Sequence, residues 1–161
     1  MEVKDKILVL GIGNLLLGDE GVGVQAVQYM EKLDLPPDID VLDGGTGGFH
    51  LLEIIQSYPT VIIIDATIDG QPAGAISILE PYFASDYPPS LSAHDVGLKD
   101  LIGSLYLLGK VPKVYLLTVS IEGIQPMTMN LSEPVQNNLE KIAEVARELV
   151  SVIRHHQPAD A

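Results

Sequence analysis

The chain has 161 residues, of which 47% are hydrophobic, and it carries a formal net charge of −13. This length suits one domain, which we expect over residues 1–161 with a frayed tail at residues 155–161. The negative charge argues against nucleic acid and anionic membrane surfaces as partners and favours a cationic partner, and the absence of cysteine excludes disulfides and thiolate ligands.

Strand and helix patterns alternate along the chain. Short apolar runs predict buried strands at Ile7–Leu10, Ile39–Leu42, Thr60–Ala66, Ala75–Glu80 and Lys113–Ile121. Apolar residues at helical spacing predict helices at Val22–Leu33, Phe49–Tyr58 and Val96–Leu108, and a last helix with Ser132 as its N-cap. Residues 67–74 are too few for a parallel crossover, so the fourth strand is expected to run antiparallel to the third. This order predicts a three-layer α/β/α fold of the α/β class. Its centre is a twisted, mainly parallel five-stranded sheet with one antiparallel strand, and helices cover both faces.

No segment indicates a membrane or secretory protein. No window reaches the ~18 apolar residues that a membrane-spanning helix needs. Glu2 and Asp5 interrupt the basic region that a signal peptide requires. We therefore expect a soluble protein that does not bind membranes. We also expect it to be cytoplasmic and monomeric.

The segment GIGNLLLGDEGVG, Gly11–Gly23, follows the first predicted strand. It lacks the third glycine of a dinucleotide-binding fingerprint, because Leu16 stands at that position. Acidic residues are also unsuitable neighbours for a phosphate. Asp19 is expected to cap the next helix, and the leucines are expected to pack the turn so that it delivers Glu20 to the strand end.

Carboxylates follow or end three successive predicted strands: Glu20, Asp43 and Asp65. Ligands bind at the carboxyl ends of the strands in sheets of this class. Clustered carboxylates repel one another unless a cation lies among them. Asp43 precedes two glycines, so a role as a turn residue stays open. Asp65 is the most telling residue, because a carboxylate directly after buried strand residues is costly unless it is paired or functional.

His94 lies in the longest predicted loop, where functional residues concentrate, although capping of the following helix is an alternative role. Two carboxylates and one imidazole form an O/O/N site with open coordination positions. Such a site suits zinc, nickel, manganese or iron rather than calcium.

Four segments in this order, LVLGIGNLLLGDEGVG, LDGGTGGFHLLEII, VIIIDA and SAHDVGLKDLI, resemble the maturation endopeptidases of nickel–iron hydrogenases. The resemblance implies an α/β/α fold and removal of a C-terminal peptide from the hydrogenase large-subunit precursor after nickel insertion. It implies metal contacts at Glu20, Asp65 and His94. The family's glycine-rich, substrate-binding turn falls on Asp43, Gly44, Gly45 and Thr46. Catalysis is implied at Asp43, Glu20 and Asp65, with either the metal or a carboxylate such as Asp43 activating water.

The resemblance also implies that the nickel belongs to the precursor, which is the expected partner, and that the free protein binds zinc, cadmium or nickel at the same site. Two alternatives stay open. A non-proteolytic nickel-binding accessory protein would keep the ligands without cleaving anything. A peptidyl-tRNA hydrolase-like enzyme begins with a similar strand and turn, but its substrate requires a basic face that this chain lacks.

Overall fold

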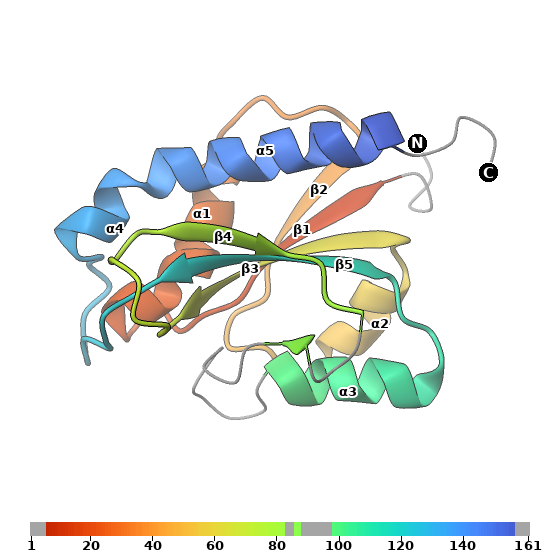
Figure 1. Ribbon diagram of the computed structural model, residues 1–161, viewed down its shortest axis with the longest axis horizontal. Helices are drawn as coiled ribbons and strands as arrows, with labels where there is room; N and C mark the ends of the chain where they lie inside the picture. Colours follow the sequence, from red (N-terminus) through yellow and green to blue (C-terminus); the bar gives the residue numbers. More distant parts are fainter. Residues whose placement is uncertain (1–5, 83–85, 88–97, 157–161) are drawn as a thin grey trace.

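The centre of the molecule is a five-stranded sheet, described in a computed structural model that covers residues 6–82, 86–87 and 98–156 (Figure 1). The strand order is β2-β1-β3-β5-β4. The strands are β1 (Ile7–Gly11), β2 (Ile39–Asp43), β3 (Thr60–Thr67), β4 (Ile76–Leu79) and β5 (Lys113–Ser120). The pairs β1–β2, β1–β3 and β3–β5 are parallel, and β4 pairs antiparallel with β5. The predicted mainly parallel sheet with one antiparallel strand is confirmed, although β4 pairs with β5 and not with its predecessor β3.

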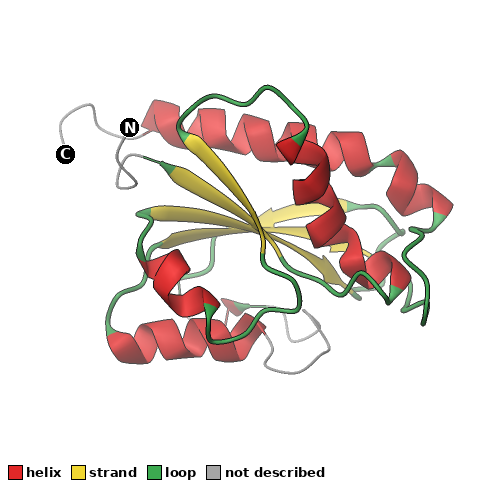
Figure 2. Cartoon of the chain, turned by 180° about the vertical axis from the view of Figure 1, so that it is seen from behind, coloured by secondary structure: helices red, strands yellow, loops and turns green. Residues whose placement is uncertain are grey.

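Helices cover both faces of this sheet, which gives three layers (Figures 1 and 2). The helical elements are the 3-10 helix η2 (Gly18–Gly21) and the α-helices α1 (Val22–Glu31), α2 (Leu51–Gln56), α3 (Leu98–Leu108), α4 (Glu133–Asn137) and α5 (Leu139–His156). Helices α1 and α5 pack on one face, and α2 and α3 on the other. The predicted α/β/α arrangement is confirmed. No helix in the described part of the chain is both long and apolar enough to cross a membrane.

The side chains of β3 alternate between the two cores. Ile62 and Ile64 belong to the core beneath α1 and α5, whereas Val61 and Ile63 belong to the core beneath α2 and α3. Every residue of β3 is buried, as expected for a central parallel strand with both faces covered. The alternation assigns each polar residue at the strand ends to one of the two faces.

The C-terminal helix is longer than expected and is divided in two. The predicted last helix forms α4 and α5, and α5 continues to His156, so His155 and His156, which we expected in the frayed tail, are helical. Arg154 Nε donates a hydrogen bond of 2.8 Å to Asp38 Oδ2, which fixes the end of α5 to the segment before β2. Residues 157–161 lie outside the described residues.

A polar contact at the amino ends of β1 and β2 is expected to stabilise the fold in a limited pH range. Tyr58 donates its hydroxyl to Asp40 Oδ2 at 2.5 Å, and Lys6 lies 3.1 Å from Asp40 Oδ1. Burial acts to raise the pKa of Asp40, but the hydrogen bonds from Tyr58 and Lys6 outweigh it and hold this pKa below 3.8. Burial and the bond to Asp40 raise the pKa of Tyr58 to about 12.

Removal of the Tyr58 hydroxyl is therefore expected to lower the free energy of unfolding between the pH values at which Asp40 and Tyr58 titrate. The contribution from Asp40 is present above pH 3.8 and is lost as the pH falls, because its folded pKa is lowered. The contribution from Tyr58 is present below pH 10 and is lost as the pH rises towards 12, because its folded pKa is raised. Tyr58→Phe should lower the free energy of unfolding by about 1 kcal/mol near neutral pH. Denaturant unfolding of both proteins should give curves that converge at the two pH extremes. A constant difference across the whole range would contradict the contact.

Candidate functional site

Glycines in the segment 11–23 let the start of α1 lie directly against the sheet. A Cβ on Gly11 would collide with the carbonyl oxygen of Gly23, and a Cβ on Gly23 would collide with the carbonyl oxygen of Ile64. Gly18 has a φ of +60°, and a Cβ there would meet the side chain of Gln125. These glycines therefore serve close helix–strand approach and a left-handed turn.

Glu20 lies in η2 at the carboxyl ends of the strands. It is 4% exposed, and η2 packs against β3. The backbone N–H of Asn14 donates a hydrogen bond of 2.6 Å to Glu20 Oε2, so the turn itself holds this carboxylate. The side chain of Asn14 accepts from the backbone N–H of Leu16 at 2.9 Å. The prediction that the leucines pack the turn is wrong for Leu16, whose side chain is 55% exposed.

Asp65 lies near the end of β3 and is completely buried. It follows the alternation of Val61 and Ile63 and therefore faces the α2 and α3 side of the sheet. Its Oδ1 accepts the backbone N–H of Ala66 at 2.9 Å. Glu20 and Asp65 are thus two buried carboxylates carried by elements that contact each other.

Three hydroxyl side chains continue this polar region along β3 and β5. Thr118 is in register with Asp65, and Ser120 is in register with Thr67. All three hydroxyl residues are buried, and by alternation they share the sheet face of Asp65. Ser120 Oγ is buried and has no hydrogen-bond partner among the residues that the structure describes. Our sequence analysis missed this row, although the change from apolar to polar residues in TVSI marks it.

Asp19 holds a different place from the one predicted. Its Oδ1 accepts the backbone N–H of Ser132 at 2.7 Å, and its Oδ2 accepts the Ser132 hydroxyl at 2.6 Å. The prediction that Asp19 caps α1 is wrong, because the N-cap of α1 is Gly21 and no side chain caps this helix there. Ser132 occupies the N-cap position of α4, but its hydroxyl is committed to Asp19. This pair joins the turn that carries Glu20 to the segment before α4.

Asp43 ends β2 and is exposed. It is in register with Gly11, so β1 lies between Asp43 and β3, a separation of about 10 Å. Asp43 follows the alternation of Ile39 and Val41, which pack into the core beneath α1 and α5. It therefore faces the opposite side of the sheet from Asp65. The structure does not bring Asp43 together with Asp65.

The glycine-rich turn after β2 is fixed to the end of β1. The backbone N–H of Gly44 donates to the carbonyl of Gly11 at 2.8 Å, and the N–H of Gly13 donates to the carbonyl of Gly45 at 2.7 Å. Asp43 Oδ1 accepts the N–H of Gly45 at 2.8 Å, and Gly45 has a φ of +57° that favours glycine. Thr46 follows, half-buried. The turn therefore lies next to the one that holds Glu20.

His94, the third expected metal ligand, lies outside the described residues. Among residues 6–82, 86–87 and 98–156, no three histidine, aspartate or glutamate side chains are grouped as a metal site. Glu20 and Asp65 are brought to one edge of the sheet, and the complete O/O/N set stays a prediction.

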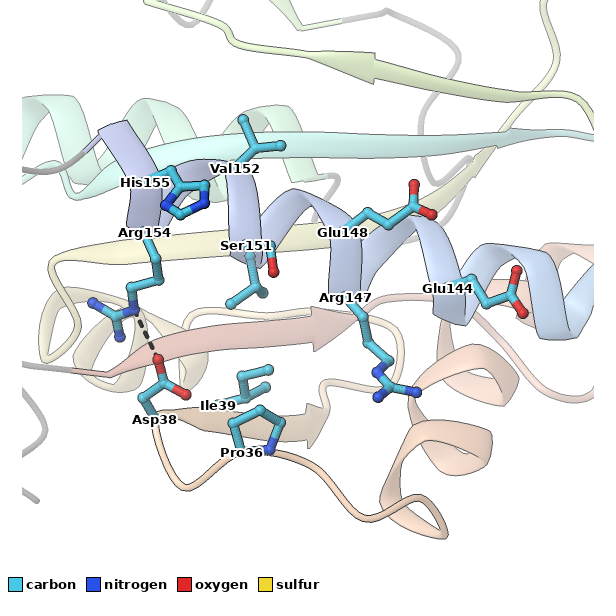
Figure 3. A pocket seen from close by; sticks show the side chains of 11 residues that line it. Pro36, Asp38, Ile39, Glu144, Arg147, Glu148, Ser151, Val152, Arg154 and His155 are labelled. Atoms are coloured by element: carbon cyan, nitrogen blue, oxygen red, sulfur yellow. Dashed lines mark hydrogen bonds and ion pairs between the residues drawn. The ribbon is translucent and has the colours of Figure 1, made fainter.

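A cavity of about 830 Å³ lies elsewhere, between α5 and the segment that leads into β2 (Figure 3). Both arginines of the chain, Arg147 and Arg154, line it. It adjoins the amino end of β2, through Asp38 and Ile39, and so lies at the opposite edge of the sheet from Glu20. This cavity is separate from the candidate site.

The chain forms a three-layer α/β/α fold with two buried carboxylates, Glu20 and Asp65, at the carboxyl edge of its sheet, the edge at which ligands bind in sheets of this class. A family model described as hydrogenase maturation protease matches residues 24–149. The hydrogenase 2 maturation protease of Escherichia coli strain K12 is 34% identical over 150 residues, which cover 89% of this chain and 92% of that protein. The solved structure of the hydrogenase maturating endopeptidase HybD from E. coli has a TM-score of 0.79 and 32% identity, and the match covers 93% of each chain. The chain belongs to the hydrogenase maturation protease family and is an endopeptidase, as its four sequence segments predicted.

A second relative extends the comparison. The hydrogenase expression/formation protein HoxM of Azotobacter vinelandii is 34% identical over 151 residues, which cover 90% of this chain and 72% of that protein. The crystal structure of the protease HycI from Thermococcus kodakarensis, at 22% identity and a TM-score of 0.74, shares the fold.

Proposed function

We propose that this endopeptidase removes the C-terminal peptide from the large-subunit precursor of a nickel–iron hydrogenase after nickel insertion, and that it recognises the nickel through Glu20, Asp65 and His94. One observation carries the assignment of the carboxylates. Glu20 is 4% exposed and Asp65 is 0% exposed, and both lie on contacting elements at the ligand-binding edge of the sheet. Burial of a carboxylate is costly, and a metal cation bound by both carboxylates would offset this cost.

In this proposal the nickel is part of the substrate. Glu20 and Asp65 supply oxygen ligands and His94 supplies a nitrogen ligand, which leaves positions for water and for groups of the precursor. A nickel ion held there polarises a carbonyl oxygen or a bound water of the precursor. We assign Asp43 to a different role, since it faces the other side of the sheet from Asp65. It orders the turn formed by Gly44, Gly45 and Thr46, against which the precursor segment binds.

The function is tested by incubating the protein with nickel-loaded and with nickel-free precursor and measuring the mass of the large subunit. The expected result is loss of a C-terminal peptide from the nickel-loaded precursor alone. An unchanged mass combined with stable binding of the nickel-loaded precursor would favour the non-proteolytic accessory protein. Retardation of tRNA at low salt would favour the peptidyl-tRNA hydrolase-like alternative.

The free protein is expected to bind one divalent metal ion weakly. Titration calorimetry with nickel, zinc or cadmium should give one site, because three protein ligands leave the coordination sphere open. His94→Ala should weaken binding at least about 10-fold, the lower range for loss of a group that supports a metal. His50→Ala is the matched control, because His50 is an exposed histidine at the start of α2. Binding that persists after combined substitution of Glu20, Asp65 and His94 would refute the site.

A further inference from the structure

Exposed apolar side chains gather on two segments beside the candidate site. Leu16 is 55% exposed, Met127 is 87% exposed and Met129 is 57% exposed. Leu16 belongs to the turn between β1 and η2, and the two methionines belong to the loop between β5 and α4. We call these three side chains the apolar rim.

Backbone hydrogen bonds hold together the two segments that carry the apolar rim. The N–H of Gly18 donates to the carbonyl of Thr128 at 2.8 Å, and the N–H of Thr128 donates to the carbonyl of Leu16 at 3.1 Å. The N–H of Gln125 donates to the carbonyl of Leu17 at 3.3 Å. Residues more than 100 positions apart in the chain therefore form one small ladder, with Leu17 and Thr128 as its bridge. The apolar side chains stand on an ordered support.

The same support positions Glu20. The N–H of Asp19 donates to Gln125 Oε1 at 2.8 Å, and the N–H of Asn14 donates to Glu20 Oε2 at 2.6 Å. The turn that carries Leu16 thus also holds the proposed metal ligand. The apolar rim is continuous with the candidate site.

Met127 adopts a backbone conformation that favours glycine. Its φ is +60°, and it is the only residue other than glycine with a positive φ in the described part of the chain. A methionine in this conformation is strained, and strained residues concentrate at functional sites. A methionine that is 87% exposed gains nothing from the core. Its flexible, polarizable side chain suits contact with another protein.

The apolar rim is also free of charge, although the chain has a net charge of −13. The two segments outside the buried strands, residues 14–18 and 123–132, contain no aspartate, glutamate, lysine or arginine. The central parts of protein interfaces are depleted of charged residues and enriched in methionine. The composition of both segments therefore fits an apolar protein partner rather than a cationic one.

We propose that the apolar rim docks an apolar surface of the hydrogenase large-subunit precursor next to its cleavage segment. The inference rests on the proposed function. Contact with Leu16 and Met127 brings the precursor against the turn that holds Glu20, so docking and metal recognition use one structural unit.

The test is Met127→Gly, which removes the side chain and relieves the positive φ. The thermal midpoint is expected to stay equal or rise, because glycine adopts this conformation without strain. The KM for nickel-loaded precursor, and its Kd, should rise about 10-fold with kcat unchanged, as for loss of a well-placed interface side chain. Leu16→Ser should act in the same direction. Leu107→Ser is the matched control, because Leu107 is 91% exposed on α3, away from the rim, and its substitution should change neither constant.

The measurements separate the docking surface from the proposed function. Nickel binding by the isolated Met127→Gly protein should equal that of the wild type. Processing by the wild type with an unchanged KM and Kd in both rim variants would overturn the docking surface alone. Binding of the precursor by the wild type without cleavage would overturn the proteolytic function, while the Kd values would still decide the docking surface. A loss of affinity in Leu107→Ser equal to that in the rim variants would also overturn the docking surface.

Discussion

Asp65→Asn is expected to reduce processing of the nickel-loaded precursor by about 100-fold or more, since even groups that only support a metal ligand contribute 10- to 100-fold. The thermal stability of the variant should be equal to that of the wild type or higher. Asp65 is completely buried, and a second buried carboxylate, Glu20, lies on an element packed against its strand. Replacing one carboxylate by a neutral amide of the same shape removes repulsion between like charges and keeps an oxygen for the N–H of Ala66. Activity and stability should therefore change in opposite directions.

The measurement pairs calorimetric unfolding with a time course of the large-subunit mass. Asp69→Asn is the matched control, because Asp69 is an exposed aspartate just beyond β3 that accepts a backbone N–H from Gln71 at 3.1 Å. It should leave processing unchanged. If Asp65→Asn unfolds, Asp65 is a structural hydrogen-bond acceptor and the assignment as a ligand fails.

The sequence predicted the fold because buried strands leave a strong local signal. The run in β3 is apolar on both faces, which is typical of a central strand between two helical layers. The length of residues 67–74 also predicted the direction of β4. This length did not predict which strand lies next to β4. A short connection restricts the direction of β4 but leaves open whether β5 inserts between β3 and β4. Pairing with β5 depends on contacts distant in the chain.

The candidate site was predictable only in part. The position of Glu20 and Asp65 at one edge of the sheet was predictable because the carboxyl ends of parallel strands meet there, whereas their role stays a prediction. Asp43 was grouped with these two residues because the sequence does not show which face of the sheet it lies on. Asp43 shares its face with Ile39 and Val41, and that face is identified only when the helices that cover it are known. Asp19 was assigned by a local capping rule, whereas its partner Ser132 lies 113 residues away. Local rules do not detect such a distant partner.

Affinity for the precursor is expected to depend on nickel by about 5- to 150-fold, the usual range of coupling between two binding events. In the proposed complex each of Glu20, Asp65 and His94 contacts nickel already held by the precursor. A nickel-free precursor brings no cation to the two buried carboxylates. A ligand shifts an equilibrium only by its difference in affinity between two states, and here the metal provides that difference.

Glu20→Gln should remove most of this discrimination together with activity, because an amide is neutral and a weaker metal ligand than a carboxylate. The carbonyl oxygen of the glutamine still accepts the N–H of Asn14, so the turn is expected to keep its shape. The measurement is retention of precursor with and without nickel on immobilised wild type, Glu20→Gln and the control Glu53→Gln. Glu53 is an exposed glutamate of α2, and its substitution should preserve the preference for nickel. Equal retention of both precursors by the wild type would mean that Glu20, Asp65 and His94 do not recognise nickel.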